Sequence, residues 1–189
     1  MQNSSAQAQS LPRPEDILQF WFEEISPKQW WQKDLQFDAM LRQRYQGVVH
    51  QAMAGELWQW RTTDTGRLAE IIVLDQFTRN IYRDTPMAFS ADGQALILAQ
   101  EAVLSGCLTR LTAVQTPFLL MPYMHSESVV IHQQAVPLFK QYASNNYDFE
   151  LRHQAIIQQF GRYPHRNAIL NRPSSAAETA FLQQPGSSF

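Results

Sequence analysis

Two charged residues interrupt an apolar helical pattern in the stretch RLAEIIVLDQFTRN, residues 67–80. Asp75 and Arg79 are four positions apart, so their side chains lie on the same face of a helix. Leu68 and Ile72 fall on that face as well. Burying either charge alone is costly, so each needs a partner. The two residues form either a structural ion pair or part of a charged site, and both interpretations stay open.

A second group of cations lies in FGRYPHRN, residues 160–167. Gly161 can end one helix, and Pro164 can begin the next. His165 and Arg166 then fall in a first turn, where free backbone N–H groups favour an anion. Cations at this position oppose the helix dipole unless an acidic partner or a bound anion compensates them. The cluster therefore predicts a bound anion or a close polar contact between helices.

Two histidines offer acid–base chemistry. His125 and Glu127 flank Ser126, which can cap a helix that begins at Glu127, so this pair either caps or belongs to a site. His153 lies on an otherwise apolar stripe, where it is either a hydrogen-bonded core histidine or a general acid or base. His132 lies among polar neighbours, and we expect it on the surface.

The sequence contains no motif for a known cofactor or catalytic nucleophile. It lacks G-x-S-x-G, a P-loop, G-x-G-x-x-G and H-E-x-x-H. Its single cysteine, Cys107, excludes an intrachain disulfide and a multi-cysteine metal site. We therefore expect no metal and no cofactor, and the sequence does not decide whether the protein is an enzyme.

Composition restricts the class of protein and its partners. The 189 residues are 44% hydrophobic and 12% aromatic, enough for one domain with a full core. The formal net charge of −2 does not favour duplex nucleic acid as a partner. No signal peptide or apolar run of membrane-spanning length is present, so we expect a cytoplasmic protein without a membrane partner. The oligomeric state is not predicted.

Helical signals recur along the chain and strand alternation is almost absent, so we expect an all-α fold of about eight helices. The expected helices cover residues 14–25, 34–54, 64–80, 90–105, 116–122, 127–144, 148–160 and 175–182. We expect a single domain over residues 14–184, between a disordered tail at 1–13 and a C-terminal tail at 185–189. A solenoid of paired helices fits these lengths, although no fixed repeat period is visible.

Several strings resemble the DUF924 family, bacterial proteins of unknown function. They are ILQFWFEE (17–24), LDQFTRNIYRDTPMAF (74–89), MPYMHSES (121–128) and FGRYPHRNAILNRPSSAAETAFL (160–182). The resemblance covers residues 14–182 and implies an all-α, TPR-like superhelix. It implies no particular activity, substrate or partner.

Most motif positions of the family match this sequence. The matching residues are Asp75, Gln76, Phe77, Arg79, Asn80, Arg83, His125, Ser126, Glu127, Arg162, Pro164, His165, Arg166 and Asn167. Thr78 stands where the family usually has proline, Met124 where it has an acid, and Asn171 where it has glycine. The missing acid before His125 weakens any scheme that needs a pair of carboxylates there.

One functional hypothesis is a polar pocket for a small anionic ligand that carries a carboxylate or a phosphate. The ligand-binding candidates are Asp75, Arg79, Asn80, Arg83, His125, Arg162, Arg166 and Asn167. The catalytic candidates are His153, His165 and Glu127, and His125 is an alternative general acid or base.

A second hypothesis is a TPR-like module whose groove binds a peptide or an acidic protein partner without catalysis. A third is that the polar residues only lock the helices in register.

Overall fold

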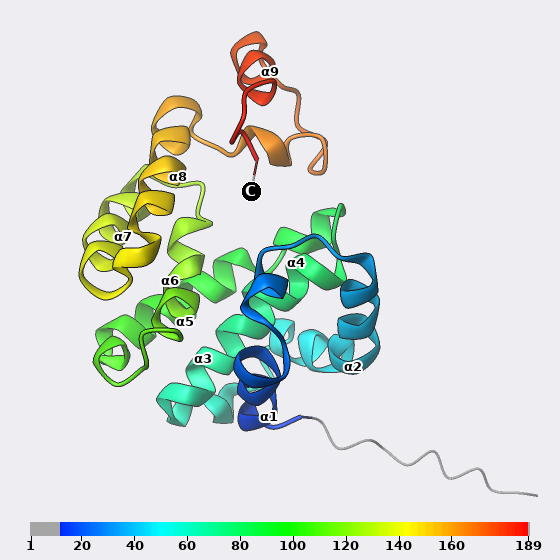
Figure 1. Ribbon diagram of the computed structural model, residues 1–189, viewed down its shortest axis with the longest axis vertical. Coiled ribbons are helices and arrows are strands. Elements are labelled where there is room, and N and C mark those ends of the chain that lie inside the picture. The colour runs from blue at the N-terminus through cyan, green and yellow to red at the C-terminus, as the bar shows by residue number, and fades with distance from the viewer. Residues whose placement is uncertain (1–11, 189) are drawn as a thin grey trace, which may run out of the picture.

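The computed structural model describes residues 12–188, and every regular element in that range is helical (Figure 1). The prediction of an all-α fold is confirmed. The α-helices are α1 (Pro14–Gln19), α2 (Leu35–Met53), α3 (Asp64–Ile72), α4 (Thr78–Ile81), α5 (Asp92–Leu104), α6 (Thr116–Met124), α7 (Val129–Tyr142), α8 (Tyr147–Phe160) and α9 (Ala176–Leu182). No helix in the described range is long and apolar enough to cross a membrane.

The TPR-like arrangement and the domain limits stay predictions. Of the predicted N-terminal tail, residues 1–11 lie outside the described residues.

The core is built around α3, which contacts α1, α5 and α6. Figure 1 shows α2 on one side of the central helices and α5 and α6 on the other. Large aromatic rings pack between these helices and η1 (Phe20–Glu24), the π-helical segment that follows α1. Trp21 and Phe77, for example, lie 5.5 Å apart between ring centroids and are both fully buried. Such rings contribute much of the buried apolar area that stabilises the fold.

The helix expected at residues 64–80 runs on to Ile81, but it changes geometry in the middle. A π-helical segment, η4 (Val73–Phe77), joins α3 to α4. Such wider turns are rare and recur at functional sites, and this one contains Asp75. Thr78, at the position where the family usually has proline, donates its hydroxyl to the carbonyl oxygen of Leu74 at 2.6 Å.

Several predicted helix ends are confirmed. Gly161 ends α8 with a φ of 69°, in the left-handed region that glycine adopts without strain. Ser175 and Glu178 form the capping box that begins α9. Asn171 has a φ of 54°, which agrees with the family's usual glycine at this position, since asparagine tolerates this region better than most residues.

The predicted start of the sixth helix, by contrast, is wrong. α7 begins at Val129 with Ser128 as its N-cap, so Ser126 is not a cap and Glu127 is not in a first turn. The carbonyl of Ser126 instead lies 2.9 Å from a ring nitrogen of His132, which holds the loop away from helical geometry. The surface position predicted for His132 is also wrong, because its side chain is fully buried.

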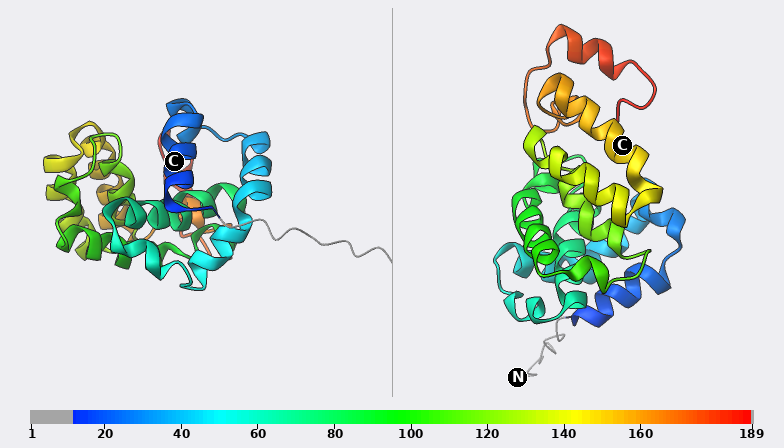
Figure 2. Two further views of the ribbon diagram at one scale, coloured as in Figure 1. Left: turned by 90° about the horizontal axis from the view of Figure 1, so that it is seen from below. Right: turned by 90° about the vertical axis from the view of Figure 1, so that its left-hand side faces the viewer.

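The segment after α8 also differs from the expectation. Pro164 begins a three-residue 3₁₀ turn, η8 (Pro164–Arg166), rather than an α-helix. A single turn has little dipole, so the conflict between helix dipole and cations that the sequence suggested is small. The segment leads to α9, which lies beyond α8 at the end of the molecule opposite α1 (Figures 1 and 2).

Gly66, in the first turn of α3, provides a test of this packing. A Cβ at Gly66 would lie 1.9 Å from the backbone oxygen of Trp60, whereas a Cβ at Gly93, in the first turn of α5, would meet nothing within 4 Å. We expect Gly66→Ala to lower the free energy of unfolding by more than about 2 kcal/mol. Gly93→Ala should leave it unchanged or raise it by up to about 1 kcal/mol. Urea denaturation measures both, and equal effects would contradict the structure.

Candidate functional site

A cavity of about 380 Å³ lies where α5 begins and α6 ends. Its volume is in the range of small-molecule sites. The polar side chains that line it come from distant parts of the chain and belong to Ser90, Asp92, His125, Ser126, Glu127 and Arg166. Phe89, Leu96 and Leu170 contribute apolar surface. The cavity therefore combines a mostly apolar wall with a few converging polar groups.

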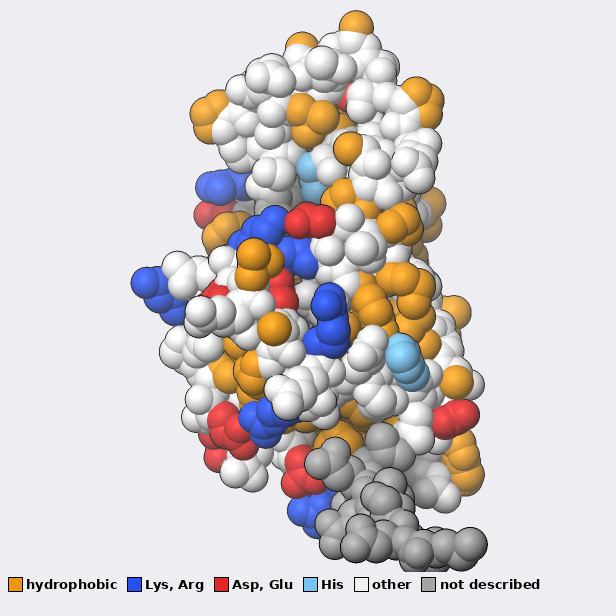
Figure 3. Space-filling model, turned by 90° about the vertical axis from the view of Figure 1, so that its right-hand side faces the viewer, with side chains coloured by type: hydrophobic (Ala, Val, Ile, Leu, Met, Phe, Trp, Pro, Cys, Tyr) orange, Lys and Arg blue, Asp and Glu red, His pale blue; other side chains and the backbone are white. Residues whose placement is uncertain are grey.

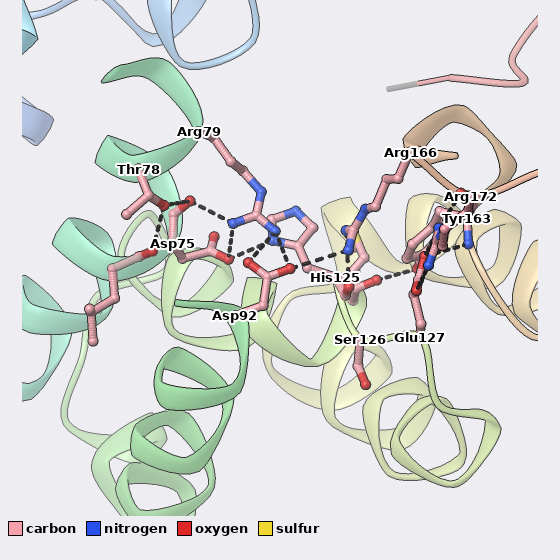
Figure 4. A network of polar contacts seen from close by, with 12 residues as sticks. Asp75, Thr78, Arg79, Asp92, His125, Ser126, Glu127, Tyr163, Arg166 and Arg172 are labelled. Atoms are coloured by element: carbon pink, nitrogen blue, oxygen red, sulfur yellow. Dashed lines mark hydrogen bonds and ion pairs between the residues drawn. The ribbon is translucent and has the colours of Figure 1, made fainter. Parts of the chain in front are cut away.

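His125 lies on the cavity wall, with Asp75 behind it. Nδ1 of His125 is 2.7 Å from Oδ1 of Asp75, and the exposed fractions of the two side chains are 18% and 1%. Because a carboxylate only accepts hydrogen bonds, Nδ1 carries the hydrogen. Nε2, on the side of the ring away from Asp75 (Figure 4), has no hydrogen-bond partner among residues 12–188. An imidazole oriented in this way is equipped to accept a proton.

Alternating carboxylates and guanidinium groups connect Asp75 to the cavity wall (Figure 4). Nη1 of Arg79 is 2.9 Å from Oδ1 of Asp75, and Nη2 is 2.9 Å from Oδ1 of Asp92. Nη1 of Arg166 is 3.2 Å from the other oxygen of Asp92. The chain of ion pairs thus joins η4, α4, α5 and η8.

Arg166 is held from several sides. It donates to the backbone carbonyl of His125 at 3.0 Å, and its guanidinium carbon is 4.6 Å from the ring centroids of both Phe89 and Tyr163. Its side chain is only 7% exposed, and its Nε has no acceptor among the described residues. Arg166 is therefore a rigid, largely desolvated cation at the cavity.

Glu127 is occupied by Arg172. The two side chains form a bidentate pair, with Nη1–Oε2 at 2.6 Å and Nη2–Oε1 at 2.9 Å. The backbone N–H of Tyr163 also donates to Glu127 at 2.8 Å. Glu127 thus ties the loop before α7 to the segment after α8, and these contacts favour an anchoring role over the predicted catalytic one.

Burial and the neighbouring charges set the protonation of the Asp75–His125 pair. Burial raises the pKa of Asp75, but Arg79 and His125 outweigh it, so the pKa of this carboxyl lies below its usual range. Burial, and then Arg79, lower the pKa of His125. At neutral pH the pair is therefore an ionised carboxylate beside a neutral imidazole.

Three predicted ligand-binding arginines, Arg79, Arg83 and Arg162, are not among the residues that line the cavity, and only Arg79 is joined to that lining, through Asp92. Arg83 does not line the cavity and is paired with Asp38 at 2.6 Å. Its Nη2 also donates to the side-chain oxygen of Asn80 at 2.7 Å. Arg162 forms a bidentate pair with Glu178 at 2.6 and 2.9 Å. Both cations join neighbouring segments of the fold, so the structure does not bring them together with Arg79 and Arg166.

Five further candidates also lie outside the cavity lining, namely Asp75, Asn80, Asn167, His153 and His165. Asp75 is joined to the lining through His125, and Asn80 donates to the backbone carbonyl of Gln76 at 2.8 Å. Asn167 donates to Glu178 at 3.3 Å. His153 bonds the carbonyl of Phe149 through Nδ1 at 2.7 Å, and burial lowers its pKa to about 3. Burial likewise lowers the pKa of His165 to about 4. The catalytic roles proposed for His153 and His165 stay predictions, and His125 is better placed than either.

The family of the chain follows from its sequence profile. The profile of the "Bacterial protein of unknown function (DUF924)" family matches residues 17–186. The chain belongs to the DUF924 family. This DUF924 protein is similar in structure to the protein of unknown function ATU0120 from Agrobacterium tumefaciens, with a TM-score of 0.86 and 30% identity over 90% of this chain and 96% of that one. Among curated proteins, no sequence matches it.

Sequence reasoning missed Asp92 and Arg172, although both bind residues that it selected. Asp92 lies in the first turn of α5, where a carboxylate is expected for the helix dipole alone, so its type gave no sign of a site. Arg172 lies inside the longest string shared with the DUF924 family, which was the available signal. Only the folded chain shows that they neutralise Arg166 and Glu127, respectively.

The buried histidines predict a loss of stability in acid. Because the pKa of His153 is lowered to about 3 in the folded state, the unfolded chain binds more protons below its ordinary pKa of 6.5. The free energy of unfolding should therefore fall as the pH decreases from about 6.5 to 4, by up to about 1.4 kcal/mol per pH unit for each such histidine. Urea denaturation from pH 7 to 4 measures this. His153→Gln should make the decrease in the free energy of unfolding with falling pH less steep, by up to about 1.4 kcal/mol per pH unit. An unchanged dependence on pH would contradict the lowered pKa of His153.

Proposed function

We propose that the cavity binds a small molecule that carries a carboxylate group, and that His125 accepts a proton from this molecule or from a water molecule beside it. The observation that carries the proposal is the Asp75–His125 pair, with Nδ1 of the ring bonded to a buried carboxylate and Nε2 left for the cavity. A neutral imidazole held in one tautomer is the form that a general base requires.

Directional donors elsewhere in the cavity lining support a carboxylate as the ligand's anchor. α5 has Ala91 as its N-cap, without a side-chain cap, and Ser90, Asp92 and Gly93 at this end line the cavity. The first amide groups of a helix have no acceptor within the helix, so they are available to an anion. Arg166 adds a charged donor to the lining, next to the backbone carbonyl of His125.

The charge balance favours a monoanion over a phosphate dianion. Asp92 and Glu127 line the cavity as carboxylates, and each is paired with an arginine. The local sum of charges is therefore close to zero, so a ligand is selected by hydrogen-bond geometry more than by net attraction. A dianion near these two carboxylates would be repelled more strongly than a monoanion.

The peptide-binding alternative has less support. A groove for an extended peptide presents its anchors along a surface, whereas Asp92, His125 and Arg166 surround a single cavity of about 380 Å³. The purely structural interpretation accounts for the ion pairs, but it gives no role to Nε2 of His125.

Arg166→Gln and Arg162→Gln form a matched pair for testing the ligand proposal. Each removes one guanidinium, but only Arg166 lines the cavity. We expect at least one of the monoanions acetate, lactate and pyruvate to raise the melting temperature of the wild type more than inorganic phosphate does. Arg166→Gln should weaken binding of that carboxylate by about tenfold or more, since a charge-assisted hydrogen bond is lost, while Arg162→Gln should retain it. Titration calorimetry measures the affinities.

Gly93→Leu provides a second test, with Gly93→Ala as its control, because the leucine side chain fills the cavity without changing a polar group. The position has open space for a side chain, so the fold should persist while carboxylate binding is lost. Gly93→Ala should still bind. Equal loss of binding in Arg162→Gln and Arg166→Gln, or stronger binding of phosphate than of every carboxylate, would contradict the proposal.

A further inference from the structure

A second histidine–carboxylate pair lies behind the cavity loop. His132 of α7 and Glu150 of α8 are both fully buried, and Nδ1 of His132 is 2.7 Å from Oε1 of Glu150. Neither residue lines the cavity, and the proposed function uses neither. The pair nevertheless touches the loop that carries His125, since Nε2 of His132 is 2.9 Å from the carbonyl oxygen of Ser126.

The contacts of Nε2 fix one proton. A carbonyl oxygen only accepts, so the nitrogen that faces Ser126 must carry a hydrogen. The hydroxyl of Tyr163 also lies near, at 3.2 Å from Nε2, and it donates its own hydrogen to the carbonyl of Met124 at 2.5 Å. The Tyr163 oxygen is thus a second acceptor for Nε2. A hydrogen on Nε2 is the only arrangement that satisfies the Ser126 carbonyl, the Tyr163 hydroxyl and Nε2 itself.

The contact between Nδ1 and Oε1 then requires one further proton. Either His132 is an imidazolium beside an ionised Glu150, or His132 is neutral and Glu150 is a carboxylic acid that donates to Nδ1. Oε2 of Glu150 is buried without a hydrogen-bond partner among residues 12–188. An ionised carboxylate with a bare oxygen is costlier to bury than a neutral acid. Burial also raises the pKa of Glu150, despite the opposing effect of His132.

We propose that Glu150 is a protonated acid that donates to His132, and that this neutral pair positions the Ser126 carbonyl and thereby the cavity loop. His132 and Glu150 are positioning residues, because neither reaches the cavity. The assignment differs from the Asp75–His125 pair, in which an arginine compensates the carboxylate. It does not depend on whether the cavity binds a carboxylate.

Tyr163 connects the His132–Glu150 pair to Arg166 and Glu127, which line the cavity. Its ring is 4.6 Å from the guanidinium of Arg166, and its backbone N–H bonds Glu127. The titratable groups that interact with the pair are His153 from α8 and Tyr163 from the segment after α8. Around these two residues lie His125 from the end of α6, Glu127 from the loop before α7, and His165 and Arg166 from the segment after α8. Measurements that follow the pair must therefore resolve it from these groups.

Infrared and NMR spectroscopy test the protonation state in the full chain. We expect a carboxylic-acid carbonyl band at pH 7 that is lost in Glu150→Gln and retained in Glu127→Gln, since Glu127 is ionised beside Arg172. Nitrogen-15 shifts of His132 should show a protonated Nε2 and an unprotonated Nδ1. These shifts should persist in Glu150→Gln, whose amide N–H can donate to Nδ1 in place of the acid. No acid band, or two protonated nitrogens on His132, would overturn the assignment.

The positioning role has a separate readout. Glu150→Gln should leave the side-chain signals of His125 at their wild-type positions, whereas Glu150→Leu should shift them because His132 loses its partner. Unchanged His125 signals in the folded leucine variant would overturn the positioning role. If the leucine variant does not fold, Glu150→Ala, which also removes the partner of His132, provides the same comparison. These outcomes need no added ligand, so they are independent of carboxylate binding.

Discussion

The charge of Asp75 is the constraint on which the candidate site depends. Its carboxylate lies within the core, in a π-helical turn between two buried helices. Such a charge persists only with compensating partners, and removal of one partner from a buried pair costs about 3–5 kcal/mol. Arg79 and His125 supply the compensation. The same contacts that allow Asp75 to remain ionised also hold the imidazole of His125 in one orientation at the cavity.

The remaining charges form an extension of this pair. Arg79 also contacts Asp92, and Asp92 contacts Arg166. Each of the two carboxylates, Asp75 and Asp92, thus has two basic partners. Glu127 and Arg172 fix the adjacent loop in a similar way. Because the partners come from helices that are distant in sequence, the network both joins the fold and shapes the cavity. A structural role and a ligand-binding role are thus compatible in these residues.

Patterns local in sequence were sufficient for the fold class and for the Asp75–Arg79 pair, since both follow from helical periodicity. They were not sufficient for partners brought together by packing. Asp92 is 74 positions from Arg166, and only the placement of α5 beside η8 joins them. His132 was assigned to the surface from its polar neighbours, because its partner Glu150 lies on the next helix and leaves no mark on the local pattern.

The tautomer of His125 is the most direct test of the site. Nitrogen-15 NMR of the wild type at pH 7, compared with Asp75→Asn, measures which ring nitrogen carries the hydrogen. A protonated Nδ1 and a free Nε2 in the wild type, with this preference weakened in Asp75→Asn, is the result that the buried carboxylate predicts. A hydrogen on Nε2 in the wild type, or an imidazolium at this pH, would contradict it.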